Sequence, residues 1–100
     1  MIKHIVMWRL AEEAGGRSRN ENALLVKQKL ESLNGRIPGL LKLEVGMDLS
    51  RSSFSYDIAL YSEFDSQHSL DEYGSHPEHE AVKKFVASVQ IERVLVDYEA

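Results

Sequence analysis

The sequence has no cysteine among its 100 residues. This absence excludes disulfide frameworks, thiol nucleophiles and cysteine-based zinc or iron–sulfur sites, and it fits a reducing compartment. No apolar run approaches the roughly 18 residues of a membrane span. The apolar N-terminal segment is short and is interrupted by Lys3, His4 and Arg9, which is not typical of a cleaved signal. We therefore expect a cytoplasmic protein with no membrane partner.

The chain also lacks an excess of positive charge. Its 12 lysine and arginine residues stand against 16 aspartate and glutamate residues, which gives a formal net charge of −4. Nucleic-acid binding requires a basic stripe, so we expect no nucleic-acid partner. The sequence has no nucleotide motif and no Ser-His-Asp order. Its glycine pair, Gly15-Gly16, lacks the strand and helix context that a phosphate-binding loop requires. We expect no cofactor.

What remains is the composition of a compact globular chain, with 43% hydrophobic residues. This length predicts a single domain over residues 1–100 with a thin core, for which self-association would be a natural supplement. Residues 2–10 alternate as a strand that places His4, Val6 and Trp8 on one side. The other side carries Ile5 and Met7 at its centre, so the strand is apolar on both faces and we expect a layer over each.

The next segment predicts an amphipathic helix. Apolar residues recur at three- and four-residue spacing from 19 to 36, Ser18 can cap the helix, and Asn34-Gly35 can end it. Residues 11–18 form a loop whose clear signal is its glycine pair. Ile37-Pro38-Gly39 then forces an extended residue and a turn.

A second helical region is predicted in two pieces. The first runs from Asp65 or Ser66 through Tyr73 and ends at Gly74 as a left-handed terminator. The second starts at residues 75–78 and ends near residue 90. Its start has two interpretations: a capping box between Ser75 and Glu78, or His76 as the cap with Pro77 in the first turn.

Three more strands complete the pattern. Residues 41–46 have one buried and one polar face, which suits an edge, and residues 54–64 pair with them as a hairpin. Residues 93–98 form the last strand. The order β-α-β-β-α-β is the split pattern of ferredoxin-like α+β folds, with a four-stranded antiparallel sheet. Helices cover only one face of such a sheet, so the apolar groups of the far face predict a second sheet, and hence a dimer.

Several short motifs, taken in order, resemble the stress-responsive dimeric A/B barrel (Dabb) family. They are Met1–Val6, Ile37-Pro38-Gly39 followed by Glu44-Val45-Gly46, Ser55-Tyr56-Asp57, Tyr73 before His76-Pro77-Glu78-His79, and Val96-Asp97-Tyr98. The resemblance implies a ferredoxin-like monomer whose sheet packs face to face with a partner's sheet in a dimeric α/β barrel. Most bacterial members of this family have no assigned activity, and fold does not decide function.

Within that family the chain is distantly similar to the plant polyketide cyclase that forms olivetolic acid by an intramolecular aldol condensation. By motif position, the resemblance implies that Tyr73 and His79 are catalytic and that His4 is a pocket histidine, while His76 also occupies a matching position. An aldol cyclisation needs a base for the proton next to a carbonyl and a donor for the enolate oxygen. In the first turn of a helix His79 would be a neutral base, since the helix N-terminus disfavours the imidazolium.

Each of these residues also has a structural interpretation. His76 and His79 can simply mark the start of a helix, and His4 can be a core or interface histidine bonded to Tyr73, His79 or Asp97. The spacing His76-x-x-His79 with a nearby glutamate is short of a zinc signature, so we expect no metal site.

The large apolar residues Trp8, Met7 and Met47 allow two interpretations, a hydrophobic ligand box or packing in the core and dimer interface. Two hypotheses for function follow. The first is a stress-associated homodimer that binds a small aromatic or polyketide-like molecule between sheet and helices, with Trp8 and His76 among its binding residues. The alternative is a cyclase-like enzyme with His79 as base, Tyr73 as oxyanion partner and His4 as the orienting residue.

Overall fold

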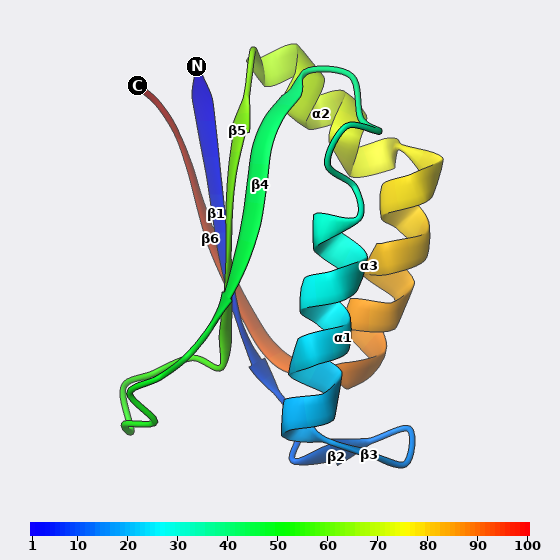
Figure 1. The fold of residues 1–100 in the computed structure, drawn as a ribbon. Helices are drawn as coiled ribbons and strands as arrows, with labels where there is room; N and C mark the ends of the chain where they lie inside the picture. Colours follow the sequence, from blue (N-terminus) through cyan, green and yellow to red (C-terminus); the bar gives the residue numbers. More distant parts are fainter.

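The computed structural model describes residues 1–100 and contains a four-stranded antiparallel sheet in the order β4-β5-β1-β6. Its strands are β1 (Ile2–Leu10), β4 (Leu40–Met47), β5 (Ile58–Phe64) and β6 (Gln90–Glu99). Three helices, α1 (Arg19–Glu31), α2 (Gln67–Ser75) and α3 (Pro77–Val89), lie on one side of this sheet (Figure 1). The predicted ferredoxin-like α+β fold is therefore confirmed. None of the helices combines the length and apolar character that a membrane crossing requires.

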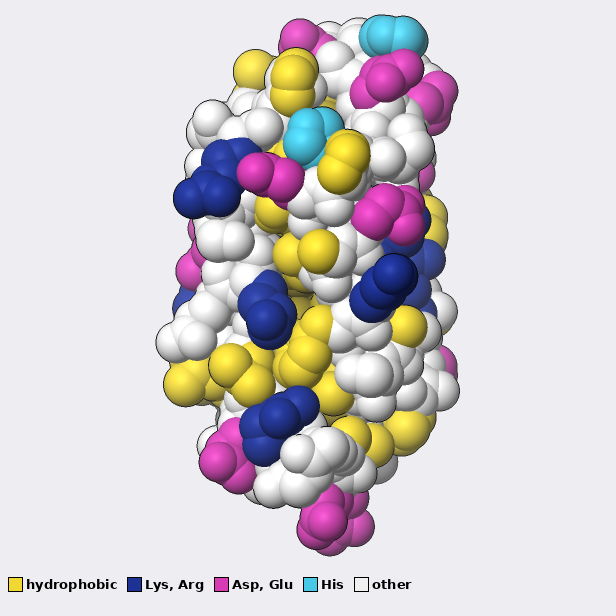
Figure 2. Space-filling model, turned by 90° about the vertical axis from the view of Figure 1, so that its right-hand side faces the viewer, with side chains coloured by type: hydrophobic (Ala, Val, Ile, Leu, Met, Phe, Trp, Pro, Cys, Tyr) yellow, Lys and Arg dark blue, Asp and Glu magenta, His cyan; other side chains and the backbone are white.

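The alternation of β1 decides which side of the sheet each residue faces. Val6 and Trp8 are buried under the helices, with 1% and 4% of their surface exposed. Met7 lies on the other face, which carries no helix, and is 40% exposed (Figure 1). We call this second face the open face. The helix side shows hydrophobic side chains between scattered charges of both signs (Figure 2).

Helix α1 starts as predicted and ends early. Ser18 is its N-cap in a full capping box, since Ser18 Oγ accepts from the Glu21 N–H and Glu21 accepts from the Ser18 N–H. The prediction that Asn34-Gly35 ends the helix places its end too late, because α1 stops at Glu31. From Leu33 onwards the backbone bonds span three residues, with Leu33 N–H donating to the Leu30 carbonyl and Asn34 N–H to the Glu31 carbonyl. The Asn34 side chain also donates to the Glu31 carbonyl, and Gly35 turns the chain at φ 78°.

Gly74 is not the left-handed terminator that we predicted. It lies inside α2, which continues to Ser75, and its φ is not positive. The helix ends because His76 precedes Pro77, and a residue before proline is kept out of the helical region. Of the two predicted starts for α3, the structure has His76 as the cap. Its Nδ1 accepts from the Glu78 N–H at 3.2 Å.

Two loops also differ from the predictions. Strand β5 starts at Ile58 rather than at Phe54, which is 91% exposed in a serine-rich turn where Ser55 N–H donates to the Ser52 carbonyl. The glycine pair lies in a tight hairpin between β2 (Glu13–Ala14) and β3 (Arg17–Ser18). Both of its glycines have positive φ, as such hairpin turns demand.

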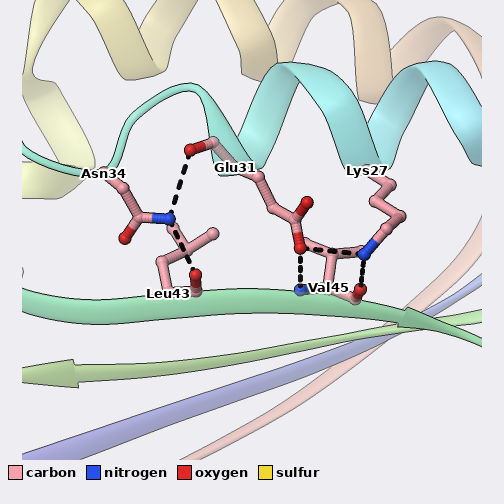
Figure 3. A network of polar contacts seen from close by, with 5 residues as sticks. All are labelled: Lys27, Glu31, Asn34, Leu43 and Val45. Carbon is pink, nitrogen blue, oxygen red and sulfur yellow. Dashed lines mark hydrogen bonds and ion pairs between the residues drawn. The ribbon is translucent and has the colours of Figure 1, made fainter.

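The two edges of the sheet are treated differently. Strand β4 is at an edge as predicted, and side chains of α1 and the following turn bind its outer backbone groups (Figure 3). Lys27 Nζ donates to the Val45 carbonyl at 2.6 Å, Glu31 accepts from the Val45 N–H at 3.1 Å, and Asn34 donates to the Leu43 carbonyl at 2.8 Å. Occupied edge groups cannot accept another strand. Strand β6, at the other edge, is exposed from Ile91 onwards.

Candidate functional site

A cavity of about 360 Å³ lies between the sheet and helices α2 and α3. Strand β1 contributes residues of its helix-facing side, α2 contributes residues near its C-terminal end, and α3 contributes residues along most of its length. Nine of the 15 lining residues are hydrophobic. The lining comprises His4, Val6, Trp8, Leu30, Leu60, Leu70, Tyr73, Gly74, His79, Val82, Lys83, Val86, Ala87, Gln90 and Arg93. The structure thus brings together four of the five predicted site residues.

His76 is the predicted site residue that does not line the cavity. Its ring caps α3 instead, through the hydrogen bond to the Glu78 N–H. The sharp turn at His76 and Pro77 nevertheless shapes the site, because it folds α3 back so that His79 reaches Tyr73 near the end of α2. No group of three or more His, Cys, Asp or Glu side chains lies together as a metal site would need.

Tyr73 and His79 form the centre of the site. Their rings are stacked, with centroids 3.8 Å apart and planes inclined by 19°. His79 Nδ1 lies 2.9 Å from the Tyr73 backbone carbonyl. Since a carbonyl can only accept, Nδ1 carries the proton, and in the neutral ring Nε2 keeps a free lone pair. The arrangement therefore offers a proton acceptor next to a phenol.

The surroundings set the protonation of both groups. Burial lowers the pKa of His79 to about 4 from an ordinary 6.5. Burial also raises the pKa of the Tyr73 hydroxyl well above its usual value. At neutral pH the imidazole is therefore uncharged and the phenol keeps its proton. The neutral histidine agrees with the expectation from sequence, but the main cause is burial rather than the helix N-terminus.

His4 is held by a partner on the neighbouring strand. It is 8% exposed, and its Nδ1 is paired with the carboxylate of Asp97, its cross-strand neighbour on β6. The imidazole also lies edge-on to the Tyr73 ring at 6.2 Å between centroids. Asp97 was one of the three partners that the sequence allowed. The pair fixes the His4 ring against Tyr73.

Two buried donors in the lining have no hydrogen-bond partner. They are the Tyr73 hydroxyl and the Trp8 indole N–H, on residues that are 2% and 4% exposed. Buried polar groups are nearly always bonded, and an unpaired one costs about 1–3 kcal/mol. Such a cost is retained at sites where a ligand supplies the missing partner. Both groups are donors, so that partner must offer acceptors.

Sequence reasoning missed three polar residues of the cavity lining. Lys83, Gln90 and Arg93 all contribute to its lining. Arg93 lies opposite Trp8 in the β1–β6 register. The alternation of residues 93–98 predicted a strand, but only its register against β1 shows which residues meet the cavity.

Comparison with known proteins identifies relatives over the full length of the chain. The family model for the stress responsive A/B barrel domain matches residues 2–100. A dimeric protein of unknown function with a ferredoxin-like fold from Bacteroides fragilis is 36% identical, with a TM-score of 0.82 over 99% of this chain and 95% of that chain. A dimeric ferredoxin-like protein of unknown function from Thermobifida fusca is 26% identical, with a TM-score of 0.84 over 99% and 90%.

One more distant likeness concerns the fold alone. Hydroxynitrile lyase from Passiflora edulis is 19% identical, with a TM-score of 0.76 over 97% of this chain and 90% of that chain. No curated protein gives a significant match. The match to the family model over residues 2–100 shows that the chain belongs to the stress responsive A/B barrel domain family.

Proposed function

We propose that the protein is a homodimer that binds a small molecule in the cavity between the sheet and the helices. The observation that carries this proposal is the pair of unpartnered donors, Tyr73 Oη and Trp8 Nε1, in a largely apolar lining. A ligand with an oxygen acceptor on an aromatic or polyketide-like body would bond both donors and bury its apolar part. The cavity volume is within the range of about 300–1,000 Å³ of small-molecule sites.

The dimer is supported by the open face of the sheet. Met7, Val94 and Val96 lie there in register and are 40%, 37% and 52% exposed. Exposed apolar side chains that form a continuous area typically mark a protein interface. Two such faces packed together would form a barrel, and the relatives from Bacteroides fragilis and Thermobifida fusca are dimeric. A role in stress rests on the family description, and a cytoplasmic location on the lack of cysteine.

Ligand binding can be tested through the single tryptophan, Trp8, which lies in the cavity lining. The intact protein is titrated with phenols, aromatic ketones and β-diketones while tryptophan fluorescence is recorded. We expect a saturable change, and Tyr73→Phe should weaken binding about tenfold because it removes one hydrogen bond to the ligand. Tyr56→Phe is the matched control outside the lining. A flat response to every compound, or equal effects of the two variants, would contradict the proposal.

A second function, proton abstraction next to a carbonyl, is favoured by the contact between His79 and Tyr73. His79 Nε2 takes the proton from the carbon beside a ligand carbonyl. The C–H electron pair forms a carbon–carbon double bond, and the carbonyl electron pair moves to the oxygen, which Tyr73 stabilises by a hydrogen bond. The enolate then recovers the proton, or it attacks a second carbonyl of the same molecule and the imidazolium protonates the new alkoxide.

The low pKa of His79 makes the isolated imidazole a weak base. The negative charge that forms on the enolate stabilises the imidazolium and offsets this effect of burial. His4, held by Asp97 against the Tyr73 ring, is a positioning residue in this reaction.

Proton abstraction can be measured as deuterium exchange at the central carbon of a β-diketone by NMR. We expect the protein to accelerate the exchange, and His79→Gln to abolish the acceleration. His68→Gln, at an exposed position of α2, should leave it unchanged. Exchange that persists in His79→Gln would rule out His79 as the base, whereas ligand binding would remain a separate question.

A further inference from the structure

Arg93 also lines the cavity, but the proposed hydrogen bonds from Tyr73 and Trp8 to a ligand give it no role. It contributes to the lining from β6, and the register pairs it with Trp8 on β1. Directly opposed residues of antiparallel strands share a face, with Cβ atoms about 4.5–5.5 Å apart. The Arg93 side chain therefore starts beside the indole. Burial raises the pKa of Tyr73 while the positive charge of Arg93 opposes this rise, so Arg93 also acts on the phenol.

The Arg93 guanidinium has neither a hydrogen bond nor an ion pair within the chain. The other cation of the lining, Lys83, is bound to Glu80 and to the Gly74 carbonyl, each at 2.9 Å. The carboxylates of the neighbouring strand residues are also engaged, Asp97 with His4 and Glu92 with Arg9 and Tyr56. Arg93 is thus a cation at the site without a counter-ion.

The charge of the lining is opposite to that of the whole chain. The chain has a formal net charge of −4, yet the lining includes Lys83 and Arg93 and no aspartate or glutamate. Lys83 and Arg93 are both exposed, so they lie at the solvent side of this lining, and Lys83 is already paired with Glu80. The unpaired Arg93 therefore gives the mouth of the cavity a local positive charge that can attract an anion, although the chain as a whole is negative.

We propose that Arg93 makes this cavity selective for carboxylates, so that the ligand is an organic acid. Its carboxylate binds the guanidinium, whose planar fork matches a carboxylate in bidentate geometry. A second oxygen of the same ligand, a carbonyl or hydroxyl, accepts from Tyr73 and Trp8, and its apolar body fills the rest of the cavity. This inference rests on the proposed function, because it requires a ligand at that site.

The test compares an acid with its uncharged amide of the same shape. The intact protein is titrated with 4-hydroxybenzoate and 4-hydroxybenzamide, and with phenylacetate and phenylacetamide, by Trp8 fluorescence and calorimetry. We expect each acid to bind about tenfold or more tightly than its amide, as a charge-assisted hydrogen bond gives. Arg93→Gln should reduce this ratio to about one, because it weakens binding of the acid far more than binding of the amide, and Arg93→Lys should retain part of the ratio because it keeps the charge.

Arg51→Gln is the matched control, since Arg51 also has no ion pair but lies outside this cavity. A wild-type ratio near one, or a ratio that Arg93→Gln leaves unchanged, would overturn the inference while amide binding still supports the proposed function. Absence of binding by all four compounds up to about 10 mM, beyond the millimolar range of weak fragments, would count against both.

Discussion

The two faces of the sheet differ in what they leave without a partner. On the helix side the unsatisfied groups are polar: the Tyr73 hydroxyl and the Trp8 indole N–H, with the Arg93 guanidinium beside them. On the open face they are apolar, as the exposed side chains of Met7 and Val96 show. Enclosed donors in a small cavity are satisfied by a small molecule, whereas a broad apolar area is satisfied by another apolar surface. One sheet can thus serve ligand binding with one face and assembly with the other.

A charge on the open face should produce the largest effect. Val96→Asp places a carboxylate where the dimer would bury it without a partner, at a cost on the order of 3 kcal/mol or more. Light scattering at micromolar concentration should then show a monomer. Leu95→Asp is the matched control, because Leu95 is similarly exposed, at 49%, but faces the helix side. If both variants dissociated equally, the open face would not be the surface that forms the dimer.

The helix side should instead respond to pH. The unfolded chain protonates His79 near pH 6.5 and the folded chain only near pH 4, so stability rises with pH between these values and is lost as pH falls. We expect a loss of about 2 kcal/mol from neutral pH to about pH 4.5. Urea unfolding of His79→Gln should lack this part of the pH dependence.

Carboxylates add to acid sensitivity at lower pH. The hydrogen bond from Lys27 lowers the pKa of Glu31, and this stabilisation is lost only as the pH falls below its ordinary value of 4.5. Above pH 4.5, the difference in free energy of unfolding between wild type and His79→Gln therefore reports the protonation of His79 alone. Identical curves for the two proteins in this interval would show that His79 is not buried as described.

Removal of the unpaired hydroxyl should stabilise the protein. Tyr73→Phe deletes a buried donor without a partner, so we expect the free energy of unfolding to rise by about 1 kcal/mol in the absence of ligand. Tyr56→Phe should lower it slightly, because that hydroxyl is bonded to Glu92. Urea denaturation measures both. A loss of stability in Tyr73→Phe would mean that the hydroxyl has a hydrogen-bond partner. The helix side would then lack one of the unpaired polar groups that distinguish it from the open face.

If the open face forms the dimer, the β4 edge of the sheet should not take part in dimerisation. Asn34→Ala removes the donor to the Leu43 carbonyl, so we expect a loss of about 1 kcal/mol with the dimer retained. Gln28→Ala, at an exposed position of α1, is the control that should change little. If Asn34→Ala changed the oligomeric state, the edge rather than the face would control assembly.

The sequence was most informative where local pattern determines position. The alternation of β1 predicted both faces of the sheet, and the cap at Ser18 fixed the start of α1. Helix ends were less predictable, because α1 ends at Glu31, before Asn34-Gly35, and α2 continues through Gly74 until the proline after His76. The alternation within one strand also does not determine which residues of a neighbouring strand lie opposite it. The pairs His4–Asp97 and Trp8–Arg93 join the two ends of the chain, so no local pattern could show that these residues meet.

The most direct test of the account follows both faces by NMR in one protein sample, with signals from the Trp8 indole N–H, the His79 ring and the Met7 methyl group. Titration with 4-hydroxybenzoate should shift the Trp8 and His79 signals and leave Met7 in place. Dilution through the dimer–monomer equilibrium should shift Met7 and leave the other two in place. A ligand that shifts Met7 alone, or shifts none of the three signals, would contradict the assignment of the cavity to ligand binding.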